Sequence, residues 1–193
     1  TLDLEETDDG LLLTSRPVKE LQMIRSETYD LHPEEISGEK TLTDIPFDVS
    51  ASEIQLEFTI SDQVTNVGVR LSNGNGEYID IGFEKQQNRF YIDRTGSGAA
   101  EFSKDFAGIH YAPRISHDKK IKLHMIVDVA SVELFADEGK SVITDIFFPG
   151  EVFGVITLHV NGGSIKLNKG LVTRLDLRKK LVQGSRKDAK PQN

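Results

Sequence analysis

Apolar and polar residues alternate with a period of two along most of this chain. The clearest runs are residues 53–60, Glu-Ile-Gln-Leu-Glu-Phe-Thr-Ile, and residues 120–127, Lys-Ile-Lys-Leu-His-Met-Ile-Val. This period is typical of β-strands that have one buried and one exposed face. Further runs that predict strands lie at residues 2–5, 11–15, 27–31, 41–45, 67–71, 77–83, 88–93, 131–136, 141–148, 155–160, 165–167 and 171–177.

Segments rich in glycine and asparagine separate several of these runs. Residues 73–76, Asn-Gly-Asn-Gly, lie between two predicted strands, and residues 137–139 and 161–163 end in glycine in the same setting. Asn and Gly tolerate the positive φ that tight hairpins require, so we expect a hairpin at each position. Residues 17–24 begin with proline and place their apolar residues on no single face, which predicts a short helix or a connector at a sheet edge.

Strands with one apolar face must bury that face against another layer. Two antiparallel sheets packed face to face do this most economically. We therefore predict an all-β fold, a two-sheet antiparallel β-sandwich of the jelly-roll or concanavalin-like type, with a closed barrel as the alternative. The expected core residues, each on the apolar phase of its strand, are Ile54, Leu56, Phe58, Val69, Ile81, Phe90, Ile92, Leu123, Met125, Val132, Leu134, Ile156 and Leu158.

The composition narrows the class of protein. The chain has 193 residues, of which 37% are hydrophobic and 28% are charged, as expected for one globular domain. No apolar run approaches the ~20 residues that span a bilayer. The net charge of −8 argues against a nucleic acid or an anionic membrane as partner. We expect one domain at residues 1–178 and a basic, disordered tail at residues 179–193, where the apolar periodicity is lost.

The residues that most catalytic or metal sites need are missing or poorly spaced. The chain has no cysteine and no Gly-x-Ser-x-Gly segment, and its histidines lack metal-ligand spacing, so we predict no metal site and no cofactor. His124 and His159 lie on the polar phase of their strands, where we expect them to be solvated. Glu53, Glu57 and Asp80 also alternate with apolar residues, so we expect them to be charges on an outer face.

One segment combines the chemical groups that bind sugars. In residues 89–98 the strand phase sends Tyr91 and Asp93 to the polar face, and Arg94 follows at the strand end. Carboxylates and guanidinium groups beside an aromatic ring are typical of saccharide sites. We take Asp93 and Arg94 as candidate substrate-binding residues, with Tyr91 as aromatic cover and Glu133 as a distant second carboxylate. The alternative is an internal network of the same side chains that only ties down the turn.

Three stretches resemble motifs of one enzyme family. Residues 9–21, Asp-Gly-Leu-Leu-Leu-Thr-Ser-Arg-Pro-Val-Lys-Glu-Leu, are similar to the segment by which family 32 glycoside hydrolases leave their catalytic propeller and enter a C-terminal β-sandwich. Residues 91–98, Tyr-Ile-Asp-Arg-Thr-Gly-Ser-Gly, resemble the Asp-Arg-Thr/Ser-x-Ser-Gly turn of that domain. Residues 127–139, followed by Phe147-Phe148-Pro149, resemble its strand-strand signature. The likeness is to levanases, exo-inulinases and invertases.

The resemblance implies that catalysis takes place outside this chain. Family members cleave β-fructosyl bonds with two aspartates and a glutamate in Trp-Met-Asn-Asp-Pro-type, Arg-Asp-Pro and Glu-Cys motifs, and none of these motifs occurs here. Residues 1–25 would lead in from the catalytic β-propeller of the same enzyme. The implied function is a non-catalytic accessory domain of a fructan-cleaving glycosidase, secreted or at the cell surface, that supports the propeller and contributes to substrate binding. The alternative is a carbohydrate-binding module that recognises the terminal fructose of levan or inulin.

Overall fold

The computed structural model describes residues 1–7 and 10–176, so the tail predicted at residues 179–193 lies outside the described residues. Two 3-10 helices, η1 (Lys19–Met23) and η2 (Asp137–Gly139), accompany the strands, and η1 occupies the segment expected to be a short helix or connector. The strands are β1 (Leu2–Thr7), β2 (Gly10–Ser15), β3 (Arg25–Leu31), β4 (Glu34–Thr41), β5 (Ser52–Ile60), β6 (Asn66–Ser72), β7 (Tyr78–Glu84), β8 (Arg89–Asp93), β9 (Ile109–Pro113), β10 (Lys120–Asp128), β11 (Ser131–Ala136), β12 (Ser141–Ile146) and β13 (Val155–Leu175).

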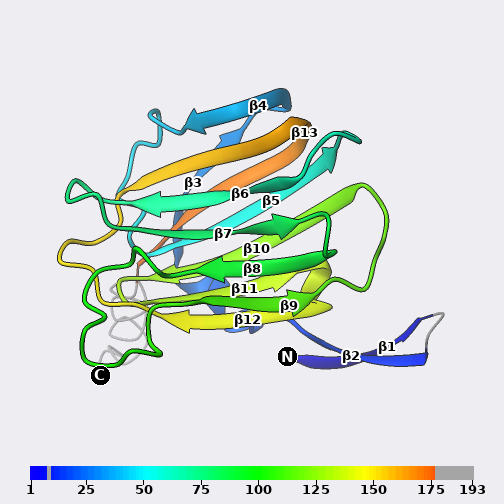
Figure 1. Ribbon diagram of the computed structural model, residues 1–193, viewed down its shortest axis with the longest axis horizontal. Helices are drawn as coiled ribbons and strands as arrows, with labels where there is room; N and C mark the ends of the chain where they lie inside the picture. Colours follow the sequence, from blue (N-terminus) through cyan, green and yellow to red (C-terminus); the bar gives the residue numbers. More distant parts are fainter. Residues whose placement is uncertain (8–9, 177–193) are drawn as a thin grey trace, which may run out of the picture.

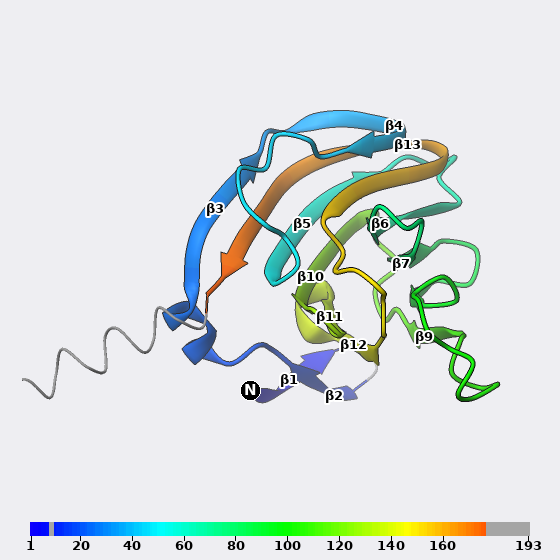
Figure 2. The same ribbon diagram turned by 90° about the vertical axis from the view of Figure 1, so that its left-hand side faces the viewer.

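The main body consists of two antiparallel layers that share β13 (Figure 1). The front sheet has the order β4-β13-β6-β7-β8-β9, and the rear sheet has the order β12-β11-β10-β5-β13-β3. Figure 2 shows the two layers facing each other and joined along the edge where β13 passes between them. The predicted all-β antiparallel sandwich is therefore confirmed, although the shared strand makes the two layers one strongly curved sheet.

The prediction of a hairpin at residues 161–163 is wrong. Val160 faces Gly38 of β4 and Ser164 faces Ser37, so the three residues between them bulge out of the ladder while β13 continues. Gly162 has a φ of +85°, which a bulge of this kind requires and glycine allows. The part of β13 before the bulge pairs with β6 and the part after it pairs with β5. The bulge therefore bends one strand from the front sheet into the rear sheet.

Two strands differ from the pattern that the sequence offers. A strand was expected at residues 41–45, but β4 ends at Thr41, and β9 had no prediction at all. β4 has Ile36 as its one apolar side chain, and only Ala112 of β9 is buried. Both strands lie at edges of the front sheet, where one neighbouring strand supplies the backbone partners and the apolar signal is weak.

All thirteen predicted core residues are buried in a single apolar cluster between the two sheets. Phe90 and Ile92 of β8 are fully inaccessible, which confirms the phase that directs the alternate residues of this strand to the outer face. The core therefore fixes which side chains the outer face of the front sheet presents, and the candidate site lies on that face.

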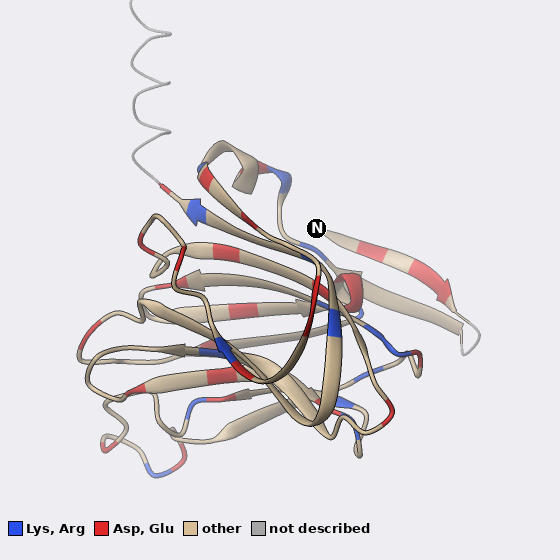
Figure 3. Ribbon diagram, turned by 90° about the horizontal axis from the view of Figure 1, so that it is seen from above, with Lys and Arg blue, Asp and Glu red and all other residues tan. Residues whose placement is uncertain are grey.

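The hairpin of β1 and β2 projects from the main body and pairs with no other strand among the described residues (Figure 1). Leu4 lies opposite Leu13, and these two leucines together with Leu2 and Leu11 are 57–74% exposed. The other face of the hairpin includes Thr14, which is fully buried. Figure 3 shows the acidic residues along β1. The hairpin thus turns an apolar face away from the domain to which it belongs.

Candidate functional site

A row of five residues crosses the outer face of the front sheet. His159 of β13 faces Gly68 of β6, Gly68 faces Gly82 of β7, Gly82 faces Tyr91 of β8, and Tyr91 faces Tyr111 of β9. Residues that face each other across neighbouring strands project on the same side of a sheet. The row therefore brings together side chains that are widely separated in the sequence.

The two glycines make a hollow in the middle of this row. A Cβ atom on Gly68 would lie 2.8 Å from His159 Nε2, and one on Gly82 would lie 2.8 Å from the Tyr91 hydroxyl. Contacts this short are not tolerated, so only glycine leaves room for the imidazole and phenol rings above the sheet. The side chains of His159 and Tyr91 occupy the space over the glycines and converge on Asp80.

Asp80 is the centre of a buried hydrogen-bond network. Its Oδ1 atom lies 2.7 Å from His159 Nε2 and accepts a hydrogen bond of 2.9 Å from the Tyr91 hydroxyl. Its Oδ2 atom accepts two hydrogen bonds from the Arg70 guanidinium, of 3.1 and 2.9 Å. Asp80 and His159 are each 6% exposed. The buried Asp80 carboxylate is therefore paired and hydrogen-bonded by side chains from three neighbouring strands, β6, β8 and β13.

The pKa values at this floor follow from burial and from the partners. Burial by itself would raise the pKa of Asp80, but the hydrogen bonds from His159 and Tyr91 and the positive charges of His159 and Arg70 outweigh it, so this pKa lies below its usual value. Burial and the nearby Asp80 carboxylate raise the pKa of the Tyr91 hydroxyl. Asp80 is thus held as a carboxylate and Tyr91 as a neutral phenol.

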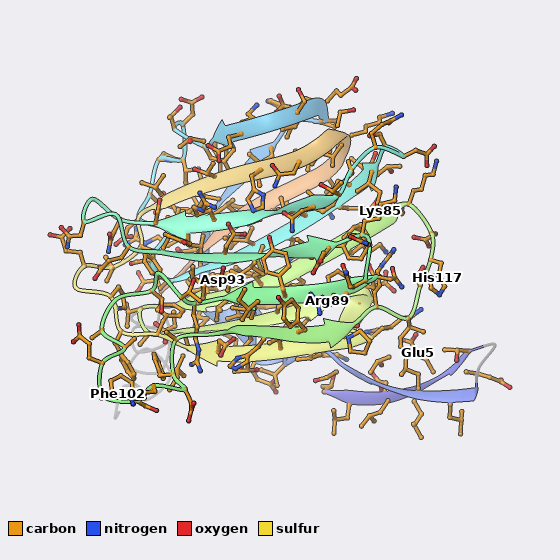
Figure 4. All side chains as sticks on the ribbon, in the orientation of Figure 1. Glu5, Lys85, Arg89, Asp93, Phe102 and His117 are labelled. Carbon is orange, nitrogen blue, oxygen red and sulfur yellow. The ribbon has the colours of Figure 1, made fainter. Side chains whose placement is uncertain are left out.

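A pocket of about 460 Å³ opens above this network. Glu84 of its wall pairs with Arg89, whose guanidinium carbon lies 3.6 Å from the centre of the Tyr111 ring. Tyr111 is still 45% exposed. Figure 4 shows Arg89 and Asp93 on the face of the front sheet that is turned toward the viewer. The lining residues are Glu39, Asn66, Arg70, Asp80, Glu84, Tyr91, Asp93, Ile109, Tyr111, His159 and Asn161.

The sequence pattern was misleading for Asp80 and His159. Both lie on the polar phase of their strands, yet they are buried, so the expectation of solvated outer-face residues is wrong for them. Neighbouring side chains cover them: Gly68 and Gly82 leave room for the side chains of His159 and Tyr91, and Arg70 donates to Asp80 Oδ2. The glycines in β6 and β7 were a signal in the sequence, because a glycine inside a strand often marks close approach of another group.

Two of the four candidate binding residues, Tyr91 and Asp93, line this pocket. Asp93 Oδ1 accepts hydrogen bonds from the backbone N–H and the hydroxyl of Thr95, at 2.9 and 2.6 Å, which stabilise the turn after β8. Glu133 is exposed on β11 of the rear sheet and does not line the pocket. The structure thus brings Tyr91 and Asp93 together and leaves Glu133 elsewhere.

Arg94, which the sequence analysis pairs with Asp93, does not line this pocket. Its guanidinium contacts Asp145 at 3.4 Å, donates to the Ile146 carbonyl at 3.0 Å and stacks over the Phe106 ring at 4.1 Å. Arg94 is 8% exposed, and its Nε atom is buried without a hydrogen-bond partner among the described residues. The idea of one site formed by Asp93 and Arg94 does not match this geometry, and neither does a direct pair between them.

A second buried carboxylate lies on the outer face of the rear sheet. Glu53 is fully inaccessible, accepts a hydrogen bond of 2.7 Å from Arg25 Nη2, and lies 2.7 Å from His124 Nε2. Burial would raise its pKa, but the hydrogen bonds and charges of His124 and Arg25 lower it to about 2. The expectation that Glu53 is a solvated charge and His124 a solvated histidine is therefore corrected: Glu53 is buried and His124 is half-buried against it.

Two further kinds of feature concern all the described residues, metal-ion sites and membrane-spanning helices. Within residues 1–7 and 10–176, no group of three or more histidines and carboxylates is placed to hold a metal ion. Over the same residues, no helix has the length and apolar character that crossing a bilayer would demand.

Comparison with known proteins identifies the family. Residues 20–175 match the family described as "Glycosyl hydrolases family 32 C terminal", and the chain therefore belongs to that family. This confirms the resemblance drawn from residues 91–98 and from residues 127–139 with Phe147-Phe148-Pro149, whereas residues 9–21 lie almost wholly outside the match. The match covers both sheets and the candidate pocket, and it leaves out the β1-β2 hairpin.

Several known proteins are similar over most or part of the chain. A levanase from Bacillus sp. (strain L7) is 30% identical over 168 residues, which is 86% of this chain and 18% of the levanase. An extracellular exo-inulinase from Aspergillus awamori is 28% identical over 116 residues, 58% of this chain and 21% of that protein. The crystal structure of an exo-inulinase from the same species has the same fold, with a TM-score of 0.78 at 20% identity over 90% of this chain and 34% of that one. The chain thus spans well under two thirds of these proteins.

Proposed function

We propose that this chain is the non-catalytic C-terminal accessory domain of a fructan-cleaving glycosidase, and that it supports a catalytic β-propeller of the same enzyme. The family match and the levanase and exo-inulinase relatives support the class of parent enzyme. The chain spans 18% of the similar levanase, which leaves ample length for a separate catalytic module in a protein of that kind. The extracellular exo-inulinase relative favours a secreted or cell-surface parent.

The observation that carries this proposal is the apolar face of the β1-β2 hairpin. Leu2, Leu4, Leu11 and Leu13 lie together on one side of the hairpin and are more than half exposed. A contiguous apolar surface of this kind is typical of a protein–protein contact. The hairpin belongs to the segment, residues 1–25, that we expect to lead in from the propeller, so a contact with the propeller would bury these leucines.

Two buried carboxylates argue against catalysis by the domain itself. A glycosidase needs one carboxyl group with a raised pKa to protonate the leaving group. The pKa values of Glu53 and Asp80 are both lowered, and each carboxylate is paired with an arginine and a histidine. Groups held in the charged form in this way cannot serve as the acid. The absence of the three family catalytic motifs from the sequence supports the same conclusion.

The test compares fructose release by the isolated 193-residue chain with fructose release by the full-length protein. The purified 193-residue chain should release no fructose from sucrose, levan or inulin, whereas the full-length protein should release fructose from levan or inulin. Reducing-sugar release measured over hours for both proteins decides the matter. Sustained fructose release by the isolated chain, abolished by changing one of its own carboxylates to the amide, would falsify the accessory role.

A second candidate function is recognition of fructan by the domain itself. The pocket above Asp80 favours it, because an open polar hollow with an exposed aromatic ring on its wall is a common form of saccharide site. The two functions are compatible, since a domain can dock on one side and bind sugar on another.

A further inference from the structure

A second pocket, of about 390 Å³, lies beside the end of β13, and we call it the end pocket. Its wall is formed by η1 and the residue after it, by the segment before β5, and by the ends of β10 and β13. The apolar lining residues are Leu21, Ile24, Ala51, Ile126, Val127 and Leu175. All of them except Val127 are only half-buried. The end pocket therefore leaves apolar surface uncovered within residues 1–7 and 10–176.

Negative charge flanks this apolar surface. Asp48 and Asp128 line the end pocket, and both are exposed. Each accepts a hydrogen bond from a backbone N–H close by in the chain, and neither forms an ion pair with another of the described residues. Arg174 is the basic residue of the lining, and it already pairs with Glu27 at 3.2 Å. Apolar surface beside unpaired carboxylates is complementary to an occupant that is both apolar and basic.

The chain continues beyond β13 at this pocket. The backbone N–H of Leu175 donates to the Ala51 carbonyl at 3.0 Å, and that of Asp176 donates to the Ile24 carbonyl at 2.7 Å. These two hydrogen bonds hold the end of β13 against two walls of the end pocket. Figure 2 shows the end of β13 close to the segment that contains η1. Whatever follows Asp176 therefore starts at the rim of the end pocket.

The sequence that follows Asp176 complements the end pocket. Residues 177–193 lie outside the described residues, and they contain six of the chain's 23 lysines and arginines but only one of its 31 acidic residues. Residues 177–182, Leu-Arg-Lys-Lys-Leu-Val, combine three basic with three aliphatic side chains. Five extended residues span at most about 17 Å. That length is enough for Leu181 and Val182 to return over a pocket that Asp176 itself lines.

We propose that residues 177–182 of this chain dock in the end pocket. Leu181 and Val182 cover its apolar wall, and the neighbouring lysines lie at Asp48 and Asp128. The docked segment joins η1 to the ends of β10 and β13 and so fixes the segment that enters the domain. Residues 179–182 were expected to belong to a disordered tail, and the proposal assigns them to the pocket instead. It does not rest on the proposed function, because neither a fructan nor a propeller takes part in the contact.

Disulfide cross-linking tests the contact, and the chain suits this method because it contains no cysteine. The test variant combines Ala51→Cys, at a half-buried position of the end pocket, with Val182→Cys. One control replaces Val182→Cys by Ser185→Cys, which places the thiol farther along the same tether. The other replaces Ala51→Cys by Gln86→Cys, at an exposed position outside the end pocket. Oxidised glutathione is the oxidant, and a thermal melt establishes that each reduced variant is folded.

The rate at which cross-linked monomer forms is measured by non-reducing electrophoresis. The thiols at positions 51 and 182 should react about tenfold faster than either control pair, because docking raises their effective concentration above that of a loose tether. Lys179→Glu with Lys180→Glu should abolish this advantage, and high salt should reduce it, since both weaken the attraction to the aspartates. Arg186→Glu with Lys187→Glu changes the net charge equally outside the docked segment and should leave the rate unchanged.

Hydrogen exchange of the cysteine-free chain gives a second measurement. Leu181→Asp with Val182→Asp should speed the exchange of the backbone amides of residues 19–24, because that wall of the end pocket then loses its cover. Gln183→Asp with Ser185→Asp adds the same charge beyond the docked segment and should leave this exchange as in the wild type.

Several results would overturn the docking. Equal cross-linking rates for the thiols at positions 182 and 185 would do so, because an undocked tether brings both to the pocket alike. An unchanged rate after reversal of both lysine charges would do so as well, as would unchanged hydrogen exchange in the Leu181→Asp, Val182→Asp variant. A cross-linked dimer in place of the cross-linked monomer would show that the segment of a second copy fills the pocket, and it would overturn a contact within one chain.

Discussion

At the scale of single residues, this domain buries two carboxylates on the outer faces of its sheets. Glu53 and Asp80 are each held by one arginine and one histidine, and Asp80 by Tyr91 in addition. Buried charges are tolerated only when they are paired and hydrogen-bonded. The two clusters lie on opposite sheets, so each pins neighbouring strands together from outside the apolar core.

Glu53 gives the domain a stability that depends on pH. Its pKa is about 2 in the folded protein against an ordinary value of 4.5, so its contribution is complete above pH 4.5 and is lost as the pH falls toward 2. A difference of this size corresponds to on the order of 3 kcal/mol. In urea unfolding, the stability advantage of the wild type over Glu53→Gln should therefore shrink by about that amount between pH 6 and pH 2.5.

The control for this comparison is Glu133→Gln, at an exposed position of β11. This variant should change the free energy of unfolding by less than about 0.5 kcal/mol at pH 6, as is usual for surface substitutions. If the difference between wild type and Glu53→Gln stays constant from pH 6 to pH 2.5, the carboxylate is not held by Arg25 and His124 in the way that the structure describes.

At the scale of elements, β13 belongs to both sheets of the main body, whereas the β1-β2 hairpin belongs to neither. β13 supplies the shared strand that joins the sheets, and its bulge at residues 161–163 sets where the chain changes layer. The hairpin lies outside both sheets and is held at its base by Arg16, which pairs with Glu5 and donates to the Glu138 carbonyl at 3.2 Å. One element closes the domain, and the other extends from it.

The exposed leucines of the hairpin should matter in the full-length protein and not in the isolated chain. The double variant Leu4→Ser, Leu13→Ser removes an exposed cross-strand pair that is not part of the core cluster. The melting temperature of the isolated chain should change by less than about 2 °C, because surface substitutions cost little. The full-length protein should lose several degrees, since burying one leucine is worth about 1.5 to 3 kcal/mol.

Differential scanning calorimetry of both forms measures this difference. Val129→Ser, Val152→Ser is the matched control, because both valines are similarly exposed and lie outside the hairpin. Equal melting temperatures of full-length wild type and hairpin variant would show that the leucines contact no other module. An equal loss caused by the valine control would show that the effect is not specific to the hairpin.

At the scale of the whole molecule, one apolar cluster fills the space between both sheets. The cluster includes Phe58 and Leu123 from the rear sheet and Phe83 and Phe90 from the front sheet, and β13 contributes to both layers. Neither layer has a core of its own. Separation of the sheets would expose the entire cluster at once.

This architecture predicts that the domain unfolds in one cooperative step. Urea unfolding followed by far-ultraviolet circular dichroism and by tyrosine fluorescence should give coincident transitions with one midpoint. Three of the four tyrosines lie in the front sheet, on β7, β8 and β9, so fluorescence reports mainly on that layer. Two separate midpoints would mean that the front sheet opens without the rear sheet, contrary to a shared core.

The sequence by itself determined most of the strands and the core, but not the edge strands β4 and β9. Runs such as residues 53–60 and 120–127 identify buried positions because a strand alternates strictly between its two faces, whatever its neighbours are. It also determined the family, through motifs that the comparison bears out. The segment around Tyr91 and Asp93 was singled out for its chemistry, and both residues do line one pocket.

Only the tertiary structure decided how the polar phase of the strands is used. Alternation looks the same for a solvated side chain and for one covered by its neighbours, so the burial of Asp80 and His159 depends on Gly68 and Gly82 across the sheet. Likewise Asn-Gly-Gly at residues 161–163 can form a turn or a bulge, and the pairing with β4, β5 and β6 selects the bulge. The physical reason is the same in both cases: contacts between strands distant in the chain determine what local residues do.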